Sequence, residues 1–450
     1  MKIIIVGAGV SGLATYLQLT QHLPRILEAE IVIYESRLDA NNDLSAPLDA
    51  DEILSDSTAV VGNSIILPPT SIRLLRRISP HLHSLFKSRG FENHAFTIAS
   101  ARGHTIARIP TDDGNFPQEY PISCPRWVLW ECLRDTVGKE RITLGKVIRV
   151  DQDGERPVVY LEDGRSDTAD LVVGADGVHS VVKRALFGTA DAFAPQFEGY
   201  RGVGSFLHMP EMPEAITKHH SVVVTFGPTG SFGYAAAAPL SQQNVGWWSN
   251  WPTEHPPTSS QLNALEVQKQ LLARHGNWQD PVIQQCIAAS STDRVYPLWT
   301  TPTLPHWGER GCVLLGDAAH SLQATSGQGA AQAIEDSVTF SLLLCRLIER
   351  ASIKHDMTCA VEQSVDAAAR GLYELRHERV ARIKTRARNL YFGGRQSKNF
   401  YWEALYYCFL FLVTRWPLLG RWIIGNAFAE TQEWDVDAEI DAYLKRQETT

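Results

Sequence analysis

The sequence predicts an α/β protein with a parallel sheet at its centre, an inserted antiparallel sheet and a helical C-terminal region. Three observations support this prediction. From residue 2 onward, continuous apolar runs typical of strands buried on both faces alternate with segments of helical spacing. Short alternating runs separated by Gly and Pro fill residues 190–300. After about residue 351 the spacing of apolar residues is mostly helical.

The composition is that of a globular chain with a large core. Of the 450 residues, 44% are hydrophobic and 20% are charged, which excludes a disordered or fibrous protein. The formal net charge of −8 argues against a broad basic face, so we expect no nucleic-acid partner. The seven cysteines have no metal-ligand spacing, so we expect no metal site and interpret them as small core residues in a reducing, cytoplasmic compartment. The apolar run before the first glycine turn is too short for a secretory signal.

The N-terminal residues read as a strand, a helix and a second strand. The strand at residues 2–6 leads into Gly7-Ala-Gly9-Val-Ser-Gly12, which opens the helix, and Glu35 ends the second strand. In this context Gly7 permits a tight turn, Gly9 lets backbone approach a pyrophosphate, and Gly12 lets helix and strand pack closely. An acid at the position of Glu35 accepts ribose hydroxyls and argues against a 2′-phosphate, so the sequence predicts a dinucleotide other than NADP as the resident ligand.

Two further turns carry a carboxylate after a buried strand, and they favour FAD over NAD. Asp176 lies in Gly174-Ala-Asp-Gly177, and Asp317 follows Gly316. Ligands of open α/β sheets bind at the carboxyl ends of the strands, where these turns lie. The second turn leads into Gly327-Gln-Gly329-Ala330 and an apolar helix. Glycines let the backbone lie against a flat ring, and the positive end of the helix stabilises the negative charge of a reduced flavin.

These three ordered motifs, spanning residue 3 to about residue 340, resemble those of the class A flavoprotein monooxygenases. That group includes para-hydroxybenzoate hydroxylase and many fungal secondary-metabolite hydroxylases. The resemblance implies a Rossmann-like FAD-binding domain interrupted by a sheet domain that binds the substrate. It also implies roles for individual residues. Gly7, Gly9, Gly12 and Glu35 would bind the ADP half of FAD, Asp317 would bind the ribitol, and Gly327, Gly329 and Ala330 would line the isoalloxazine edge. Asp176 would bind both FAD and the pyridine nucleotide, and Arg126 and Ser64, in the segment 62–69, would lie beside the flavin.

The activity implied by the resemblance is the insertion of one oxygen atom into an aromatic or polycyclic small molecule, by hydroxylation or epoxidation, in secondary metabolism. NADPH or NADH would reduce the flavin, O2 would add at C4a, and the hydroperoxide would transfer one oxygen atom. Two alternatives stay open. One is a related flavoenzyme without oxygen insertion, such as a halogenase or a reductase, although residues 248–252 do not match the halogenase signature. The other is a non-catalytic flavin-binding regulatory protein.

The sequence departs from the family pattern in two places. Ser321 and Ala324 stand where the family usually has proline. Val182-Lys183, followed by Arg184, stands where the family has a Val-Arg pair, so the basic residue that meets NAD(P)H is left open.

On the substrate side, Tyr200-Arg201-Gly202 resembles a family segment that faces the active site. We therefore consider Arg201 as a catalytic candidate that orients flavin or substrate, with a rim salt bridge as the alternative. Tyr234 is a second candidate, which would hydrogen-bond the substrate, and packing is its alternative. The tryptophans at 247, 248 and 251 are expected in the core, with alternate residues facing the pocket.

The predicted domain boundaries follow from these elements. The FAD-binding domain comprises residues 1–75, 120–187 and 296–350; the substrate domain comprises residues 76–119 and 188–295; the helical region is 351–450. The aromatic segment Phe400–Phe428 is expected to pack on the flavin domain or a subunit interface, with peripheral membrane contact as the alternative. The basic run beginning at Arg376 is interpreted as a solvated helix face. The oligomeric state is left open.

Overall fold

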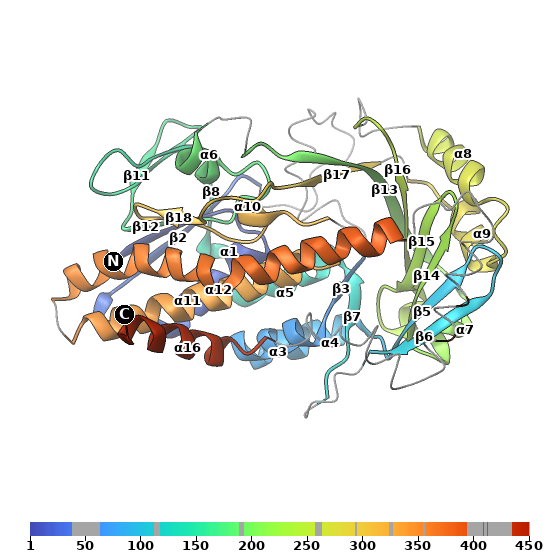
Figure 1. Ribbon diagram of the computed structural model, residues 1–450, viewed down its shortest axis with the longest axis horizontal. Coiled ribbons are helices and arrows are strands. Elements are labelled where there is room, and N and C mark those ends of the chain that lie inside the picture. The colour runs from blue at the N-terminus through green and yellow to red at the C-terminus, as the bar shows by residue number, and fades with distance from the viewer. Residues whose placement is uncertain are drawn as a thin grey trace.

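A computed structural model describes residues 1–37, 64–111, 118–188, 193–256, 263–292, 295–323, 327–353, 356–393, 408, 412 and 434–449. A parallel sheet and long helices form one end of the molecule, and a largely antiparallel sheet with short helices forms the other (Figure 1). The aromatic segment Phe400–Phe428 lies outside the described residues, apart from positions 408 and 412.

The central sheet has six strands in the order β18-β19-β12-β1-β2-β8. All neighbouring pairs from β19 to β8 are parallel, and only β18 is antiparallel to its neighbour. Because parallel strands end at the same edge, the turns that follow β1, β2, β12 and β19 share one side of the sheet. The strands are β1 (Lys2–Val6), β2 (Glu30–Glu35), β8 (Ile142–Leu144), β12 (Leu171–Gly174), β18 (Gly308–Glu309) and β19 (Cys312–Leu314).

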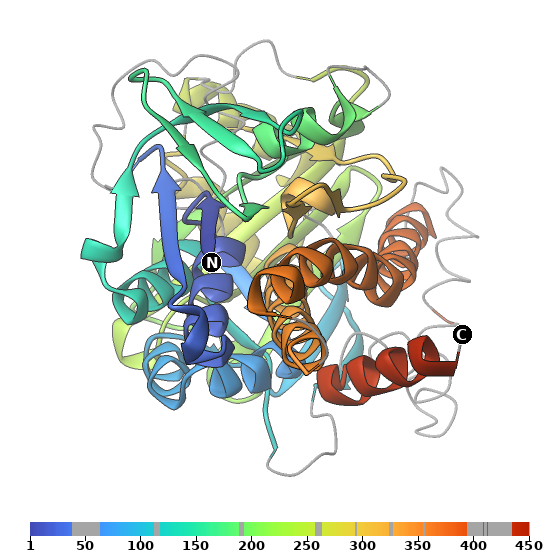
Figure 2. The same cartoon turned by 90° about the vertical axis from the view of Figure 1, so that its left-hand side faces the viewer.

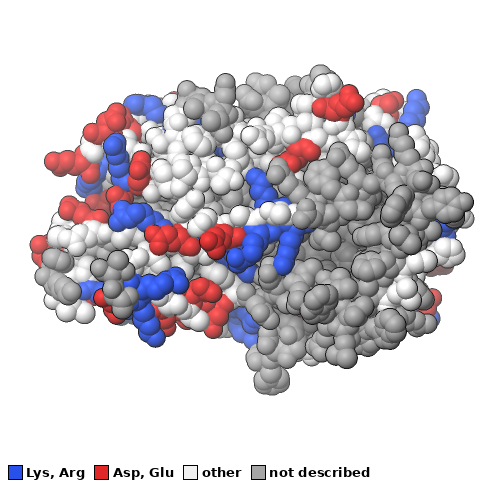
Figure 3. Space-filling model, viewed as in Figure 1, with Lys and Arg blue, Asp and Glu red and all other residues white. Residues whose placement is uncertain are grey.

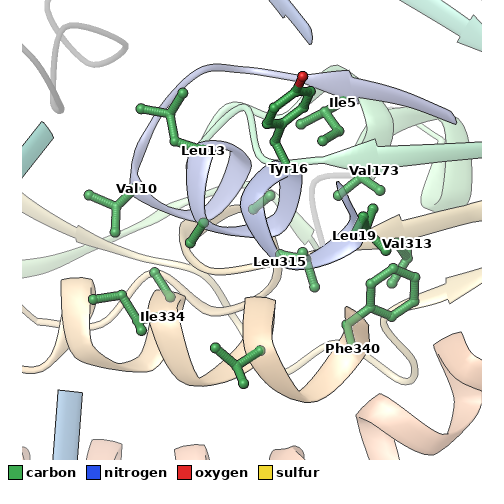
Figure 4. Close-up of a cluster of buried hydrophobic side chains, with 14 of the residues drawn as sticks. Ile5, Val10, Leu13, Tyr16, Leu19, Val173, Val313, Leu315, Ile334 and Phe340 are labelled. Carbon is green, nitrogen blue, oxygen red and sulfur yellow. The ribbon is translucent and has the colours of Figure 1, made fainter. Parts of the chain in front are cut away.

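Helix α1 (Val10–His22) lies between this sheet and the long helix α11 (Gly329–Ala351). Figure 4 shows the core formed there, in which Leu19 of α1 lies near Val173 and Val313 of the strands and near Phe340 of α11. Around this core lie α3 (Pro69–Ile78), α4 (Pro80–Arg89), α5 (Arg126–Val137), α6 (Val181–Phe187), α10 (Asp317–His320), α12 (Met357–Gly393) and α16 (Val436–Thr449), with the short 3-10 helices η1 (Arg25–Leu27) and η2 (Lys139–Arg141).

The second large sheet has seven strands in the order β17-β13-β16-β15-β14-β5-β6. Its strands are β5 (Ala95–Ser100), β6 (Thr105–Pro110), β13 (Gln196–His208), β14 (Ser221–Gly227), β15 (Gly230–Ala236), β16 (Asn244–Pro252) and β17 (Tyr296–Thr300). One face, called the outer face here, packs against α7 (Glu214–Thr217), α8 (Ala264–His275) and α9 (Pro281–Ala288). The opposite, inner face contacts Ile66 of β3 (Ser64–Leu67).

Two small sheets and one further 3-10 helix complete the fold. The first small sheet joins β3 to β7 (Ile122–Pro125) and β4 (Phe91–Glu92). The second consists of β9 (Val147–Asp151), β10 (Val158–Leu161) and β11 (Ser166–Thr168), and it lies over the central sheet in Figure 2. The 3-10 helix is η4 (Leu240–Gln242).

The predicted fold class, a parallel α/β sheet with an inserted antiparallel sheet and helices at the C-terminal end, is confirmed. Two elements fall differently from the predicted domain boundaries. Strand β17 belongs to the seven-stranded sheet, although its residues were assigned to the FAD-binding domain. Leu82 and Phe86 of α4 are buried in the core beside α1, although α4 was assigned to the substrate domain. We therefore propose that β17 belongs to the substrate domain and α4 to the FAD-binding domain.

A buried charge network joins α10, α11 and α12. It corrects the interpretation of the basic run as a solvated face at Arg376 and Arg379, whereas Arg382 of the same run is exposed. Arg376 is 0% exposed and donates to Asp336 Oδ1 at 2.9 Å and to Glu335 Oε2 at 2.6 Å. Asp336 Oδ2 lies 2.5 Å from His320 Nε2 and accepts the Gly316 N–H at 3.1 Å. Burial raises the pKa of Asp336, but the neighbouring His320 and Arg376 lower it by more. The net pKa of Asp336 is therefore below its usual value.

Charges of both signs share the surface seen in Figure 3, and most of the cysteines are buried. On the face shown in Figure 3, acidic and basic side chains are interspersed over the helices at the left. Five cysteines are buried, and all seven are free thiols. Among the described helices, none combines the length and the apolar character that crossing a membrane requires.

We expect Arg376→Met to lower the free energy of unfolding by about 3–5 kcal/mol, because Glu335 would lose one of its buried cations and Asp336 its only buried arginine. Arg382→Met is the matched control, since Arg382 lies on the same helix with a 56% exposed side chain and should change stability by less than about 0.5 kcal/mol. Urea unfolding followed by circular dichroism measures both. Equal stability of the two variants would contradict the network's contribution.

Candidate functional site

The first glycine turn is held tightly between β1 and α1. Gly7 has φ of 99°, a conformation that side chains disfavour, and its N–H donates to Tyr34 O at 2.8 Å. A Cβ atom at Gly12 would lie 1.9 Å from Gly7 O, so only glycine fits there. The Ala8 N–H donates to Glu35 Oε2 at 2.7 Å, and Glu35 Oε1 accepts the Arg37 N–H at 3.1 Å. The carboxylate of Glu35 therefore lies beside the turn.

The second turn contacts the first. A Cβ atom at Gly7 would lie 2.5 Å from Ala175 O and 3.1 Å from the Cα of Asp176. Asp176 Oδ2 accepts the Val181 N–H at 2.7 Å, whereas its Oδ1 is buried without a hydrogen-bond partner among the described residues. Burial raises the pKa of Asp176, against the effects of the Ser180 side chain and the neighbouring N–H groups.

The third turn contacts α1 and α11. Gly316 has φ of 57°, and a Cβ atom there would lie 2.3 Å from Ser11 Oγ. Asp317 begins α10, and its Oδ1 would lie 3.8 Å from a Cβ atom at Gly329, the first residue of α11. The three turns predicted to share one site are therefore packed against one another or against the same helix.

Arg126, the first residue of α5, brings a cation to this group. Its side chain is half-buried and forms no hydrogen bond or ion pair within 4.0 Å with another described residue. Burial lowers the pKa of the Arg126 guanidinium, and the charge of Asp317 partly opposes this shift. Helix α5 is fixed to the first turn, because Trp130 Nε1 donates to Ala8 O at 2.9 Å.

Ser64 links this group to the inner face of the seven-stranded sheet. It pairs with Pro125, the residue before Arg126, and its Oγ is buried without a hydrogen-bond partner among the described residues. A Cβ atom at Gly246 would lie 1.8 Å from Ser64 Oγ, so β3 crosses the sheet in direct contact with β16. Ser64, in the segment 62–69 that is expected beside the flavin, therefore contacts the sheet at Gly246.

The two catalytic candidates lie on the outer face of the same sheet. Tyr234 is 4% exposed among the residues that pack against α8 and α9, and its hydroxyl donates to Asp280 Oδ2 at 3.1 Å. Arg201 pairs across strands with Trp251, and its NH2 donates to His255 O at 2.9 Å. The structure does not bring Arg201 or Tyr234 to Arg126 and Ser64, and their catalytic roles stay predictions.

The Ser321 departure from the family pattern has a structural consequence. The Ser321 N–H donates to Thr301 Oγ1 at 3.1 Å, and Ser321 O accepts the Thr301 N–H at 3.1 Å. Thr301 Oγ1 also lies within 3.3 Å of Asp317 O. Proline has no N–H to donate, so serine here ties the Asp317 turn to the end of β17. Ala324 lies outside the described residues.

Lys183 and Arg184 differ in exposure. Lys183 is 5% exposed, and its Nζ donates to Val178 O at 2.7 Å. Burial lowers the pKa of Lys183 to about 8. Arg184 is exposed and donates to His179 O at 3.0 Å. Of the two, Arg184 is the cation that is exposed to solvent.

These residues fit FAD. Gly9 caps α1 without a side-chain hydrogen bond, and Gln328 does the same for α11, so the first N–H groups of both helices can bind the diphosphate and the flavin ring. Side-chain atoms of Asp176 and Ser64 are buried without a partner, and Arg126 is an unpaired cation among the described residues. A Cβ atom at Gly327 would meet nothing within 4 Å, which leaves open space at the α11 end. Ala330 packs against the core behind this end.

We expect Glu35→Ala to raise the Kd for FAD at least about tenfold, because the ribose loses its acceptor and the Ala8 N–H loses its partner. Quenching of flavin fluorescence on titration of the apoprotein measures this Kd. Glu30→Ala is the control, since Glu30 lies on the same strand with a 62% exposed side chain. An unchanged Kd in Glu35→Ala would remove Glu35 from the ribose site.

The buried amine of Lys183 makes a pH dependence testable. The folded-state pKa of about 8 lies below the unfolded value of ~10.4, so the cost of burying the charge is present below pH 8 and is relieved as the pH rises. From about pH 8 to about pH 10, the wild-type protein should therefore gain about 2–3 kcal/mol of unfolding free energy relative to Lys183→Met. Lys146 is the control, because its side chain is 54% exposed: relative to Lys146→Met, the wild-type protein should gain no unfolding free energy over this pH range. A pH-independent difference between wild type and Lys183→Met would contradict the assigned pKa.

The comparisons with known proteins agree with this geometry. A family model described as "FAD binding domain" matches residues 55–355, which is more than half of the chain. Zeaxanthin epoxidase of Solanum lycopersicum is 30% identical over 261 residues, covering 57% of this chain and 35% of that protein. The chain thus spans about a third of the length of this relative. The 6-hydroxynicotinate 3-monooxygenase of Bordetella bronchiseptica is 26% identical over 340 residues, covering 72% of this chain and 80% of that protein.

Two solved structures share the fold over nearly the whole chain. HpxO of Klebsiella pneumoniae, complexed with FAD and uric acid, has a TM-score of 0.71 at 18% identity and covers 96% of both chains. A salicylate hydroxylase substrate complex has a TM-score of 0.67 at 15% identity, covering 96% of this chain and 98% of that one. The turns, the unpaired cation and the family match lead to one conclusion: the chain belongs to the FAD-binding-domain family, as its resemblance to class A flavoprotein monooxygenases predicts.

Proposed function

We propose that the protein is an FAD-dependent monooxygenase that consumes NADPH or NADH and inserts one oxygen atom from O2 into an aromatic or polycyclic small molecule, by hydroxylation or epoxidation, in secondary metabolism. The observation that carries this proposal is the position of Arg126. Arg126 is a half-buried cation with no hydrogen-bond or ion-pair partner among the described residues. Burial lowers its pKa and the negative charge of Asp317 partly opposes this shift, and Arg126 directly follows Pro125, the residue that pairs with Ser64.

When bound, FAD supplies the redox chemistry by taking electrons from NAD(P)H and activating O2 for transfer to the substrate. The chain supplies binding at the ADP end. The glycine turn from Gly7 through Gly9 to Gly12 and the first N–H groups of α1 would bind the diphosphate, and Glu35 would accept the ribose hydroxyls. Asp176, with one buried carboxylate oxygen free of partners among the described residues, adds an acceptor beside this turn.

The chain also supplies electrostatic stabilisation at the ring end. Arg126 and the open N-terminus of α11, with Gly327, Gly329 and Ala330, would favour the negative charge that a reduced flavin carries. Asp317 would accept from the ribitol hydroxyls. Because the charge network behind α10 fixes the Gly316 N–H, these groups need little rearrangement during the reaction.

The inner face of the seven-stranded sheet provides the substrate side. It meets Ser64 at Gly246, next to the Arg126 end of β7, and reaches the Asp317 turn through Thr301. A packed sheet over the ring would exclude water, which supports oxygen transfer to substrate over loss of the activated oxygen. The peripheral membrane contact considered for the C-terminal aromatic segment concerns residues outside the described ones, and it stays a prediction.

The test is substrate-stimulated NAD(P)H oxidation by the purified, flavin-loaded protein. A panel of indoles, phenols and polyketides is offered with isotopically labelled O2, and products are analysed by mass spectrometry. We expect at least one compound to stimulate both NAD(P)H and O2 consumption and to gain one labelled oxygen atom. A flavin reductase would consume NAD(P)H without labelling any compound, and a regulatory flavoprotein would consume none; either result would overturn the proposal.

Arg126→Met sharpens this test. Removing the cation should lower the rate of substrate-stimulated NAD(P)H oxidation by about 10²-fold, in proportion to the loss of one preorganised charge. The exposed Arg165→Met is the control, because Arg165 pairs only locally with Asp163 at the surface. An unchanged rate in Arg126→Met, with full flavin content, would contradict the role of Arg126.

A further inference from the structure

We propose that the inner face of the seven-stranded sheet binds an uncharged, planar and largely apolar substrate, with Trp248 as its stacking surface and Asn250 as its hydrogen-bonding group. This inference rests on the proposed function and deepens it, because it names the substrate class and two specificity-determining residues. It is argued from the position of the two side chains, from what surrounds them, and from the charges that the face lacks.

The strand register places Trp248 and Asn250 between the two parts of the candidate flavin site. Gly246 of β16 contacts Ser64, and Trp248 and Asn250 follow at alternate positions on the same face. Across the sheet Asn250 pairs with Gly202, which pairs with Tyr296 at the start of β17. The other end of β17 leads to Thr301, which bonds to the Asp317 turn. A substrate on this face therefore lies between Ser64 and Asp317.

Trp248 is half-buried and packs on the inner face of the sheet, against the cluster that contains Val222, Val224 and Ala235. A Cβ atom at Gly233 would lie 2.3 Å from Trp248 Cζ2 and 2.4 Å from Cε2, so the indole rests on the backbone of the neighbouring strand. Its ring is half-buried and makes no ring contact or hydrogen bond with another described residue. Trp247 provides the contrast, because it is 1% exposed on the outer face and stacks on Phe232 at 5.4 Å and 9°. Of these two adjacent tryptophans, Trp248 is the one whose ring is partly exposed.

Asn250 lies two residues after Trp248 on β16, on the same face, and its carboxamide has no hydrogen-bond partner among the described residues. Its Oδ1 would lie 2.7 Å from a Cβ atom at Gly202, so the side chain extends over that glycine. The residue is half-buried. A buried amide gains by pairing, so it favours a ligand that carries a hydroxyl, carbonyl or N–H group.

This part of the face carries no charge. The inner-face positions from 202 to 206, from 231 to 235 and from 246 to 250 are glycine, alanine, serine, Phe206, Trp248 and Asn250. A substrate carboxylate on these strands would find no cation and would lose its hydration without compensation. The glycines at these positions let the Trp248 indole and the Asn250 side chain lie directly over the neighbouring strands. The half-buried indole favours an aromatic or conjugated ligand.

The test compares two ligands that share one ring system, 2-naphthol and 2-naphthoate, titrated into the flavin-loaded protein and followed by the change in flavin absorbance. Without any turnover, 2-naphthol should bind at least tenfold more tightly than 2-naphthoate. Trp248→Ala should weaken 2-naphthol binding about five- to tenfold, and Trp248→Phe should stay within about threefold of wild type, because it keeps an aromatic surface.

Asn250→Lys should shift the preference toward 2-naphthoate at least tenfold, because it places a cation on this face. Gln242→Lys adds the same charge at an exposed position and should leave the preference unchanged. Tighter or equal binding of 2-naphthoate by the wild type, no binding of 2-naphthol, or an unaltered 2-naphthol affinity in Trp248→Ala with full flavin content would overturn the inference. These ligand-binding results are independent of NAD(P)H oxidation, so the inference and the proposed function fail separately.

Discussion

The site depends on one constraint, which is the close packing of turns at the carboxyl edge of a parallel sheet. Because β1, β2, β12 and β19 run in the same direction, the residues after them share one side. Glycines then allow these turns to touch: a side chain at Gly7 would collide with Ala175, and one at Gly316 with Ser11. The carboxylates and helix N-termini thus form one extended binding surface, and each turn alone would be an ordinary connection.

The rest of the molecule fixes this surface from behind and covers it from the front. Behind it, Asp336 binds both the Gly316 N–H and the buried guanidinium of Arg376, so the long helix α12 helps to position the third turn. In front, β3 carries Ser64 against Gly246 of the seven-stranded sheet. The helix α12 therefore helps to hold the candidate flavin site, and the inserted sheet contacts it, although both are distant from its N-terminal turn in sequence.

The sequence predicts the elements whose signals are local, and it leaves open those features that long-range pairing decides. The turn from Gly7 to Gly12 and its acid, Glu35, lie within one strand-helix-strand unit and are placed as predicted. The faces of Arg201 and Tyr234 depend on strand register, and β13 has a register shift between Phe197 and Arg201 at Gly199, where φ is 75°. Arg376 was taken as solvated because its partners lie 40 and 41 residues away. The alternation expected around Trp247 and Trp248 does place these two residues on opposite faces of the seven-stranded sheet.

The central claim is that one FAD molecule extends along the carboxyl edge of the sheet from Glu35 to Asp317 and ends beside Arg126. Electron density for crystals of the flavin-loaded protein tests it most directly. We predict the adenosine ribose at Glu35, the ribitol at Asp317, and the isoalloxazine ring between Arg126 and the inner face of the seven-stranded sheet. Density for the flavin ring on the outer face, near Tyr234 and α9, or an adenosine remote from Glu35, would contradict the claim.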